Sequence, residues 1–174
     1  THFEYGAGPM AAFGRIPIAI RHLNKPSVAA INGVAAGGGT GLALACDFRI
    51  VSDQARFTTV FMRRSIMPDT GITWLLPRLV RMDRALELLF TADTIDARQM
   101  EEVGLATHVV PHDELMDQAI AFAQRIANGP FALPLTRKAV YQGMNHDLSV
   151  ATEIEGHFAD LCANSEDLKE GVAA

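Results

Sequence analysis

The stretch that decides the fold runs from Asn32 to Asp47 and reads NGVAAGGGTGLALACD. The apolar run at 27–31 before it predicts a buried strand, and the residues from Gly38 to Ala45 predict a helix. Glycine has no Cβ, so three consecutive glycines let a ligand approach the backbone closely. The first turn of a helix leaves N–H groups unpaired and carries partial positive charge. The stretch therefore predicts a donor site for an oxyanion or a phosphate, with close packing of helix on strand as the simpler alternative.

The common nucleotide-binding motifs do not match this stretch. A G-x-G-x-x-G pattern fails because its last position is Leu42 when counted from Gly37 and Leu44 when counted from Gly39. A P-loop requires a lysine after the glycines, and none lies near them. An oxyanion site is therefore the preferred chemical interpretation.

The rest of the chain reads as strands alternating with helices, followed by helices alone. This order predicts an α/β fold with a partly parallel sheet. Pro17 is expected to kink the first helix, and Asp96 with Gln99 forms a candidate capping box. The periodicity predicts strands at 47–52 and 56–59, an extended run at 105–110, and helices at 9–23, 70–80, 83–90, 96–103, 114–127, 132–143 and 149–162.

Composition places the chain among globular proteins, with 174 residues, 49% hydrophobic residues and 20% charged residues. The net charge of −5 argues against nucleic acid or anionic membranes as partners. Neither an export leader nor an apolar run of membrane-spanning length stands in the sequence. Cys46 and Cys162 are expected to be free thiols in the reducing cytoplasm. Both ends of the sequence read as interrupted elements, so we expect a fragment of a longer chain.

A second candidate for chemistry is Asp69, in the segment MPDTG at 67–71. The simpler interpretation is an N-cap, in which the carboxylate accepts an N–H group of the helix that follows. The alternative is a carboxylate base or nucleophile in an apolar pocket. The apolar residues that would line this pocket are Phe61, Met62, Ile66 and Trp74.

Other catalytic constellations are weaker. His108 and His112 stand four residues apart, but Pro111 lies between them and no third ligand is near, so no metal site is expected. No serine stands in a G-x-S-x-G nucleophile elbow.

Several segments together resemble the crotonase superfamily, also called the enoyl-CoA hydratase/isomerase superfamily. They are KPSVAAING at 25–33, AGGGTGLALACD at 36–47, LPRLV at 76–80 and EEVGLA at 101–106. The resemblance implies a spiral of strand-strand-helix (ββα) units, followed by a C-terminal helical region used in trimerisation. It divides the chain into a spiral core at 1–110, truncated at its N-terminus, and a helical region at 111–174. A homotrimer or hexamer is the implied assembly.

The same resemblance implies acyl-CoA chemistry of the kind used in fatty acid metabolism. Family members stabilise a thioester enolate in an oxyanion hole made by two backbone N–H groups. The matching donor here is Gly38, beside Gly37 as a substrate contact, and the second donor would precede Thr1. The acyl-CoA substrate carries the coenzyme A, so neither a separate cofactor nor a metal is expected.

Two departures from the hydratase pattern bear on the reaction. The family's two hydratase glutamates correspond to Gly41 and Phe61, which cannot ionise. The Pro-Asp-x-Gly turn at 68–71 is similar to that of family members that shift double bonds. The leading expectation is an enoyl-CoA double-bond isomerase with Asp69 as the proton shuttle. The alternatives are an enoyl-CoA hydratase, an aspartate-nucleophile dehalogenase or hydrolase, and a non-catalytic acyl-CoA-binding paralogue.

Overall fold

The computed structural model describes residues 13–163 and 165–173, which divide into two compact units. In the described chain, the first unit comprises residues 13–23 and 27–123, and the second comprises 24–26, 124–163 and 165–173. The first unit therefore continues beyond Val110, where the sequence predicts a domain boundary. That boundary stays a prediction.

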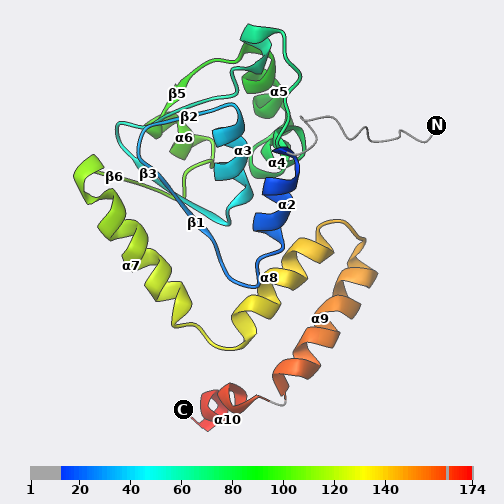
Figure 1. Ribbon diagram of the computed structural model, residues 1–174. Helices are drawn as coiled ribbons and strands as arrows, with labels where there is room; N and C mark the ends of the chain where they lie inside the picture. Colours follow the sequence, from blue (N-terminus) through cyan, green and yellow to red (C-terminus); the bar gives the residue numbers. More distant parts are fainter. Residues whose placement is uncertain (1–12, 164, 174) are drawn as a thin grey trace, which may run out of the picture. The chain divides into compact units, whose positions relative to one another are not determined.

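Two three-stranded sheets form the centre of the first unit (Figure 1). The order β1-β3-β6 is parallel throughout, whereas in β2-β4-β5 the last strand runs antiparallel to β4. The strands are β1 (Val28–Ile31), β2 (Val34–Ala36), β3 (Phe48–Ser52), β4 (Arg56–Thr58), β5 (Ile95–Asp96) and β6 (His108–Val110). The strands β1 and β2 enter different sheets, as do β3 and β4, and the helix at 38–45 separates the first pair from the second. This strand-strand-helix order confirms the predicted α/β spiral.

Hydrogen bonds between Ser27 and Asp47 join the residues that directly precede β1 and β3. The backbone N–H of Ser27 donates to the Asp47 carboxylate over 2.7 Å, and the Ser27 hydroxyl donates to the same oxygen over 2.9 Å. The Asp47 N–H donates back to the Ser27 hydroxyl oxygen over 3.1 Å. Both residues belong to the segments that carry the family resemblance, and here they set the parallel register of the two strands.

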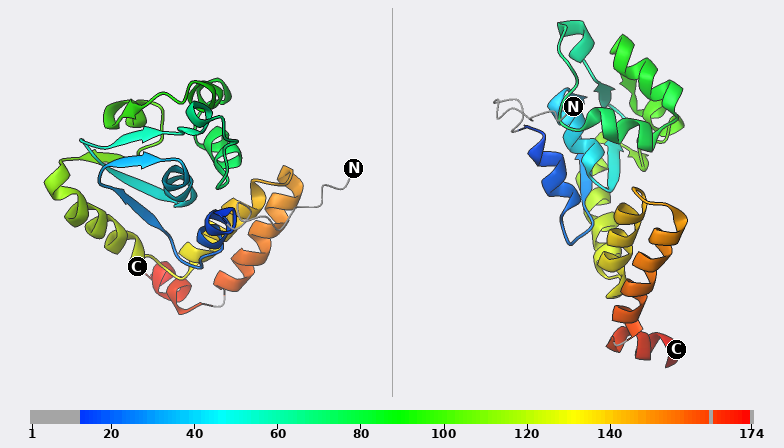
Figure 2. Two further views of the ribbon diagram at one scale, coloured as in Figure 1. Left: turned by 45° about the horizontal axis from the view of Figure 1, so that its top comes forward. Right: turned by 90° about the vertical axis from the view of Figure 1, so that its right-hand side faces the viewer.

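The helix α3 (Gly38–Ala45) has the bounds that the sequence predicts. Its residues Leu44 and Ala45 are fully buried, and the helix packs against β2, α2 and α4 (Figures 1 and 2). Because the glycine-rich turn leads directly into this helix, the core itself fixes the position of the turn.

The helix α2 (Arg15–Arg21) is the described part of the helix predicted at 9–23; residues 9–12 lie outside the described residues. Pro17 is its third residue and is buried. A proline in the first turn removes no intrahelical hydrogen bond, so the expected kink is not required.

The apolar spacing predicts the helices at 70–80 and 83–90, and both are present, but it does not predict the short helix that begins at Phe61. The helices between β4 and β6 are η1 (Phe61–Arg64), α4 (Ile72–Leu79), α5 (Met82–Thr91) and α6 (Ala97–Glu102). The capping box at α6 is confirmed, because the Gln99 N–H donates to the Asp96 carboxylate over 2.9 Å and the Asp96 N–H donates to the Gln99 side chain over 3.0 Å.

The C-terminal part of the chain is helical, as predicted. After η2 (His112–Glu114), the helix α7 (Leu115–Ala127) begins in the first unit, where Leu115 and Ala119 pack against Ile50 of β3. In the second unit, α8 (Ala132–Gly143) and α9 (Leu148–Ala163) form an antiparallel pair, followed by α10 (Glu166–Ala173) (Figure 1).

The two cysteines do not pair with each other. Cys46 and Cys162 are free and half-buried. None of the described helices combines the length and the apolar character needed to cross a membrane.

Candidate functional site: a glycine-rich helix start beside an aspartate turn

The N-terminus of α3 offers backbone donors that the described chain leaves unpaired. Gly37 precedes the helix with φ +54° and ψ −121°, a conformation that favours glycine, and no side chain caps the helix. The N–H groups of Thr40 and Gly41 both donate to the Gly37 carbonyl, over 3.0 and 3.3 Å. The N–H groups of Gly38 and Gly39 have no hydrogen-bond partner among the described residues. Two adjacent donors with partial positive charge are therefore available to an oxyanion.

Thr40 fixes this helix start on the sheet. Its side chain is fully buried, and its hydroxyl donates to the Thr58 carbonyl of β4 over 3.0 Å. A donor site works best when it does not reorganise as charge develops. The hydrogen bond from Thr40 to β4 holds the start of α3 in place and so makes the glycine turn rigid.

Asp69 lies in the loop between η1 and α4 and is half-buried. The N-cap interpretation of its side chain is wrong, because α4 has Gly71 as its N-cap and no side chain caps that helix. It is the main-chain carbonyl of Asp69 that accepts the Ile72 N–H, over 3.2 Å. The carboxylate has one neighbouring donor in the described chain, the Thr70 hydroxyl at 3.3 Å. The Asp69 carboxylate therefore neither caps α4 nor forms an ion pair with any described residue.

The aspartate turn is packed directly on α3. A Cβ added to Gly41 would lie 2.5 Å from the Thr70 hydroxyl oxygen and 2.6 Å from the Thr70 backbone carbonyl oxygen. A Cβ added to Gly38 would lie 3.8 Å from the Thr70 methyl group, an ordinary contact. The residue after Asp69 thus touches the first turn of α3, and the acid and the donors, predicted from separate segments, meet in one region.

The two positions that the family resemblance matches to hydratase glutamates differ in their surroundings. Gly41 is buried beneath Thr70. Phe61 is also buried, and its ring edge lies 3.9 Å from where a Gly37 Cβ would stand. Both positions border the glycine turn, yet neither carries an ionisable group.

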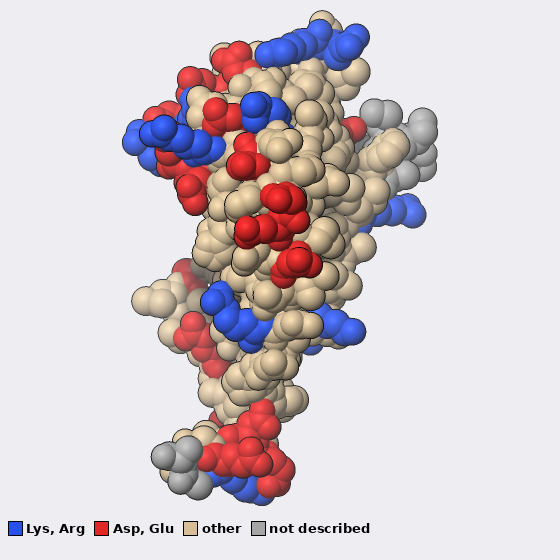
Figure 3. Space-filling view, turned by 90° about the vertical axis from the view of Figure 1, so that its left-hand side faces the viewer, with Lys and Arg blue, Asp and Glu red and all other residues tan. Residues whose placement is uncertain are grey.

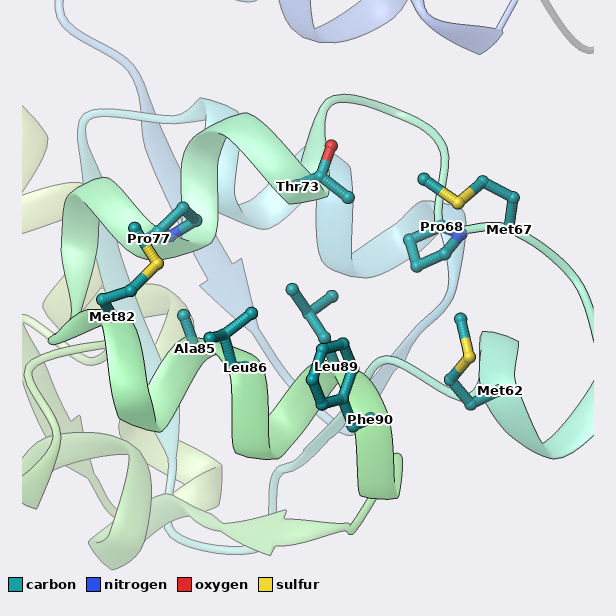
Figure 4. Close-up of a pocket in the computed structure, with 10 residues that line it drawn as sticks. All are labelled: Met62, Met67, Pro68, Thr73, Pro77, Met82, Ala85, Leu86, Leu89 and Phe90. Carbon is teal, nitrogen blue, oxygen red and sulfur yellow. The ribbon is translucent and has the colours of Figure 1, made fainter.

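An apolar pocket of about 260 Å³ opens beside the aspartate turn (Figure 4). Pro68, the neighbour of Asp69, forms part of its wall. Its lining comes from η1, the aspartate turn, α4 and α5: Met62, Met67, Pro68, Thr73, Pro77, Met82, Ala85, Leu86, Leu89 and Phe90. Oxygen and nitrogen atoms contribute little to this wall, so the pocket suits a hydrocarbon group.

Of the predicted pocket residues, only Met62 lines this pocket. Ile66 is 47% exposed on the aspartate loop. Trp74 is 39% exposed, and the Arg78 guanidinium carbon lies 3.9 Å from its ring centroid. Phe61, Ile66 and Trp74 as substrate contacts stay predictions.

Sequence reasoning missed the contribution of α5. Met82, Leu86 and Phe90 are exposed apolar residues at four-residue spacing, while Ala85 and Leu88 face the core. The sequence of this helix contains a second apolar stripe in addition to the one that packs in the core. Such a stripe indicates that the exposed face of the helix contacts something other than the core.

His108 and His112, which stand four residues apart in the sequence, have different neighbours. The His108 ring packs edge-on against Phe122, with centroids 5.6 Å apart, whereas the His112 Nδ1 lies 2.9 Å from the Ser52 hydroxyl. The described residues contain no group of three or more His, Cys, Asp or Glu side chains placed to hold a metal ion.

The electrostatic setting of the described chain is acidic overall. In the view of Figure 3, Asp and Glu side chains form separate groups with Lys and Arg side chains between them, and the full sequence has a net charge of −5. Burial raises the pKa of the Cys46 thiol above its ordinary value, which favours the protonated form over the reactive thiolate.

Comparisons with known proteins agree with this geometry. The family model described as "Enoyl-CoA hydratase/isomerase" matches residues 12–174. A crotonyl-CoA hydratase of Syntrophomonas wolfei is 40% identical over 156 residues, which cover 89% of this chain and 60% of that protein. A 1,2-epoxyphenylacetyl-CoA isomerase of Escherichia coli is 37% identical over 153 residues, 87% of this chain and 58% of that protein.

Solved structures show the same likeness. An enoyl-CoA hydratase from Bacillus anthracis superimposes with a TM-score of 0.91 at 37% identity, covering 95% of this chain and 64% of that one. The chain thus spans about three fifths of the length of these relatives.

Proposed function

Because the chain belongs to the enoyl-CoA hydratase/isomerase family, we propose that it binds the thioester carbonyl of an acyl-CoA at the first turn of α3. The unpaired N–H of Gly38 supports this role, with Gly37 as a further contact and a second donor from outside the described residues. Donors that are already fixed in position stabilise an oxyanion most strongly. Losing one such donor typically costs about 2.7–4 kcal/mol of transition-state stabilisation.

The reaction we propose is the migration of a carbon–carbon double bond, with Asp69 as the proton shuttle. The Asp69 carboxylate takes a proton from the carbon next to the thioester, and the C–H electron pair passes into an enolate whose oxygen faces α3. The protonated Asp69 then returns the proton to the γ carbon, and the double bond forms between the α and β carbons. One acid suffices because proton removal and return are sequential. The observation that carries the proposal is an uncommitted carboxylate one residue from the contact with α3.

Hydration is the second candidate, since a crotonyl-CoA hydratase is 40% identical to the chain. Adding water requires one group to activate the water and another to protonate the α carbon. Gly41 and Phe61 supply neither, which favours isomerisation over hydration. A nucleophilic role for Asp69 and a non-catalytic acyl-CoA-binding role are the remaining candidates.

The apolar pocket beside Pro68 supports a hydrocarbon acyl group as the part of the substrate that lies beyond the thioester. The second unit supports self-association, because Val140, Met144 and Leu148 expose 54%, 47% and 80% of their surfaces. Exposed apolar residues of this kind on paired helices are typical of an assembly interface. We therefore include a homotrimer or hexamer in the proposal.

The test compares wild-type, Asp69→Asn and Asp113→Asn forms of the full-length protein on a panel of β,γ- and α,β-unsaturated acyl-CoA esters. Asp113 is exposed in η2 and serves as the matched control. We expect Asp69→Asn to lower isomerisation by about 10²–10⁴-fold, the usual contribution of a general base, with binding retained. Asp113→Asn should be as active as the wild type.

Each competing reaction has its own signature. Loss of the conjugated enoyl absorbance without double-bond migration would indicate hydration. A mass increase on Asp69 after rapid quenching would indicate a covalent acyl intermediate, and binding without turnover of any ester would indicate a non-catalytic paralogue. Undiminished isomerisation by Asp69→Asn would refute the proposed mechanism.

A further inference from the structure

Thr70 adopts an unusual backbone conformation for its residue type. It is 4% exposed and has φ +52°, in the left-handed region that β-branched residues rarely occupy. Such conformations persist where the surrounding structure holds them, and they concentrate at functional sites. The neighbouring Gly71 has φ +73°, where glycine carries no such penalty.

The three parts of the Thr70 side chain each have a defined neighbour. Its hydroxyl donates to the main-chain carbonyl of Asp69 over 2.7 Å and lies 3.3 Å from the Asp69 carboxylate. Its Cβ stands 2.6 Å from the point that a Gly41 Cβ would occupy, and its methyl group lies over Gly38. The same residue therefore contacts the acid and the helix start that carries the donors.

Gly41 makes this arrangement possible. The Thr70 carbonyl oxygen also lies 2.6 Å from the Gly41 Cβ position, and a backbone atom cannot rotate away as a side chain does. Any side chain at position 41 would displace the whole turn from α3. The absence of a side chain at Gly41 thus leaves a space on α3, and Thr70 packs into that space.

We propose that Thr70 is the positioning residue for Asp69, with its hydroxyl orienting the carboxylate toward the first turn of α3. This inference rests on the proposed function, because it assigns Thr70 a role in the proton transfer by Asp69. A hydroxyl that shares its proton with the carboxylate limits the rotation of the Asp69 side chain. Correct orientation of a catalytic group is expressed in kcat more than in KM.

The experiment measures kcat and KM of isomerisation for Thr70→Val, Thr70→Ser and Thr136→Val in the full-length protein. Thr70→Val keeps the shape and removes the hydroxyl, whereas Thr70→Ser keeps the hydroxyl and removes the methyl group. Thr136 is an exposed residue of α8 whose hydroxyl donates to the Ala132 carbonyl, so its replacement by valine removes a comparable bond far along the chain.

We expect Thr70→Val to lower kcat by about 10- to 100-fold, as for a lost hydrogen bond to a charged group, with KM within about threefold of wild type. Thr70→Ser should retain most of kcat, and Thr136→Val should match the wild type. In an Asp69→Asn background, Thr70→Val should lower the residual rate no further, because its effect passes through Asp69.

Two outcomes would overturn the inference in distinguishable ways. If the wild type isomerises substrates and Thr70→Val keeps the wild-type kcat, or Thr70→Ser loses as much as Thr70→Val, only the role of Thr70 is refuted. If the wild type isomerises no ester on the panel, the proposed function fails, and the positioning role fails with it. A thermal unfolding midpoint measured for each variant separates loss of folding from loss of rate.

Discussion

The contact between Thr70 and Gly41 predicts opposite effects for two alanine substitutions two residues apart in α3. Both Gly39→Ala and Gly41→Ala replace glycine by the residue with the highest helix propensity, a gain of up to about 1 kcal/mol. A Cβ at position 39 meets no atom within 4 Å. A Cβ at position 41 meets three Thr70 atoms at 2.5–2.6 Å. Only the second substitution therefore forces atoms to move.

The magnitude follows from this overlap. Non-bonded carbon atoms prefer separations of about 3.5–4.0 Å, so the clash at position 41 amounts to roughly 1 Å against three atoms. Overpacking of this kind usually costs about 1–3 kcal/mol, which exceeds the gain in helix propensity. Gly41→Ala should destabilise the protein by about 1–2 kcal/mol, while Gly39→Ala should stabilise it slightly.

Thermal unfolding followed by circular dichroism measures this difference. For a chain of this length, 1 kcal/mol corresponds to a shift of about 2–4 °C in Tm, so the two variants should differ by roughly 4–10 °C. Urea unfolding gives the free energies directly. Equal Tm values for Gly39→Ala and Gly41→Ala would show that Thr70 does not pack on α3, and the geometry of the candidate site would be wrong.

Two further predictions concern stability. Thr40→Val should lower the free energy of unfolding by about 1–2 kcal/mol in urea titration, because the buried Thr58 carbonyl loses its hydroxyl donor; an unchanged value would show that this bond does not anchor α3. The hydroxyl of Ser149 donates to the carboxylate of Asp147 and lowers its pKa below the usual value of 3.8. A lowered pKa in the folded state stabilises the fold above 3.8, and this contribution disappears as the pH falls further. The stability difference between wild type and Asp147→Asn should therefore be constant well above pH 3.8 and should shrink as the pH falls below 3.8, and a difference that does not change on acidification would contradict the assignment.

Local features of the chain were readable because their causes lie within a few residues. The bounds of α3 coincide with the prediction, since the glycines end the preceding strand and the apolar run that follows has no breaker. The capping box at Asp96 and Gln99 was likewise predictable, because both of its hydrogen bonds span three residues.

Elements that depend on distant partners were missed. The strand β2 has three small apolar residues after a turn, and it is a strand because β4, which follows much later in the chain, pairs with it. The two-residue β5 exists only through its pairing with β4. Propensity within such short segments carries little signal, so tertiary pairing decides them.

The sequence by itself determined that the chain is an α/β protein with a glycine-rich helix start and an acid in a proline-containing turn. These features follow from backbone freedom, periodicity and capping chemistry, which act over a few residues. Only the tertiary structure decided that the Asp69 carboxylate does not cap α4, that Thr70 fills the space left open by Gly41, and that α5 lines the apolar pocket. These facts depend on how segments far apart in the sequence pack together, and close packing permits one arrangement of their side chains.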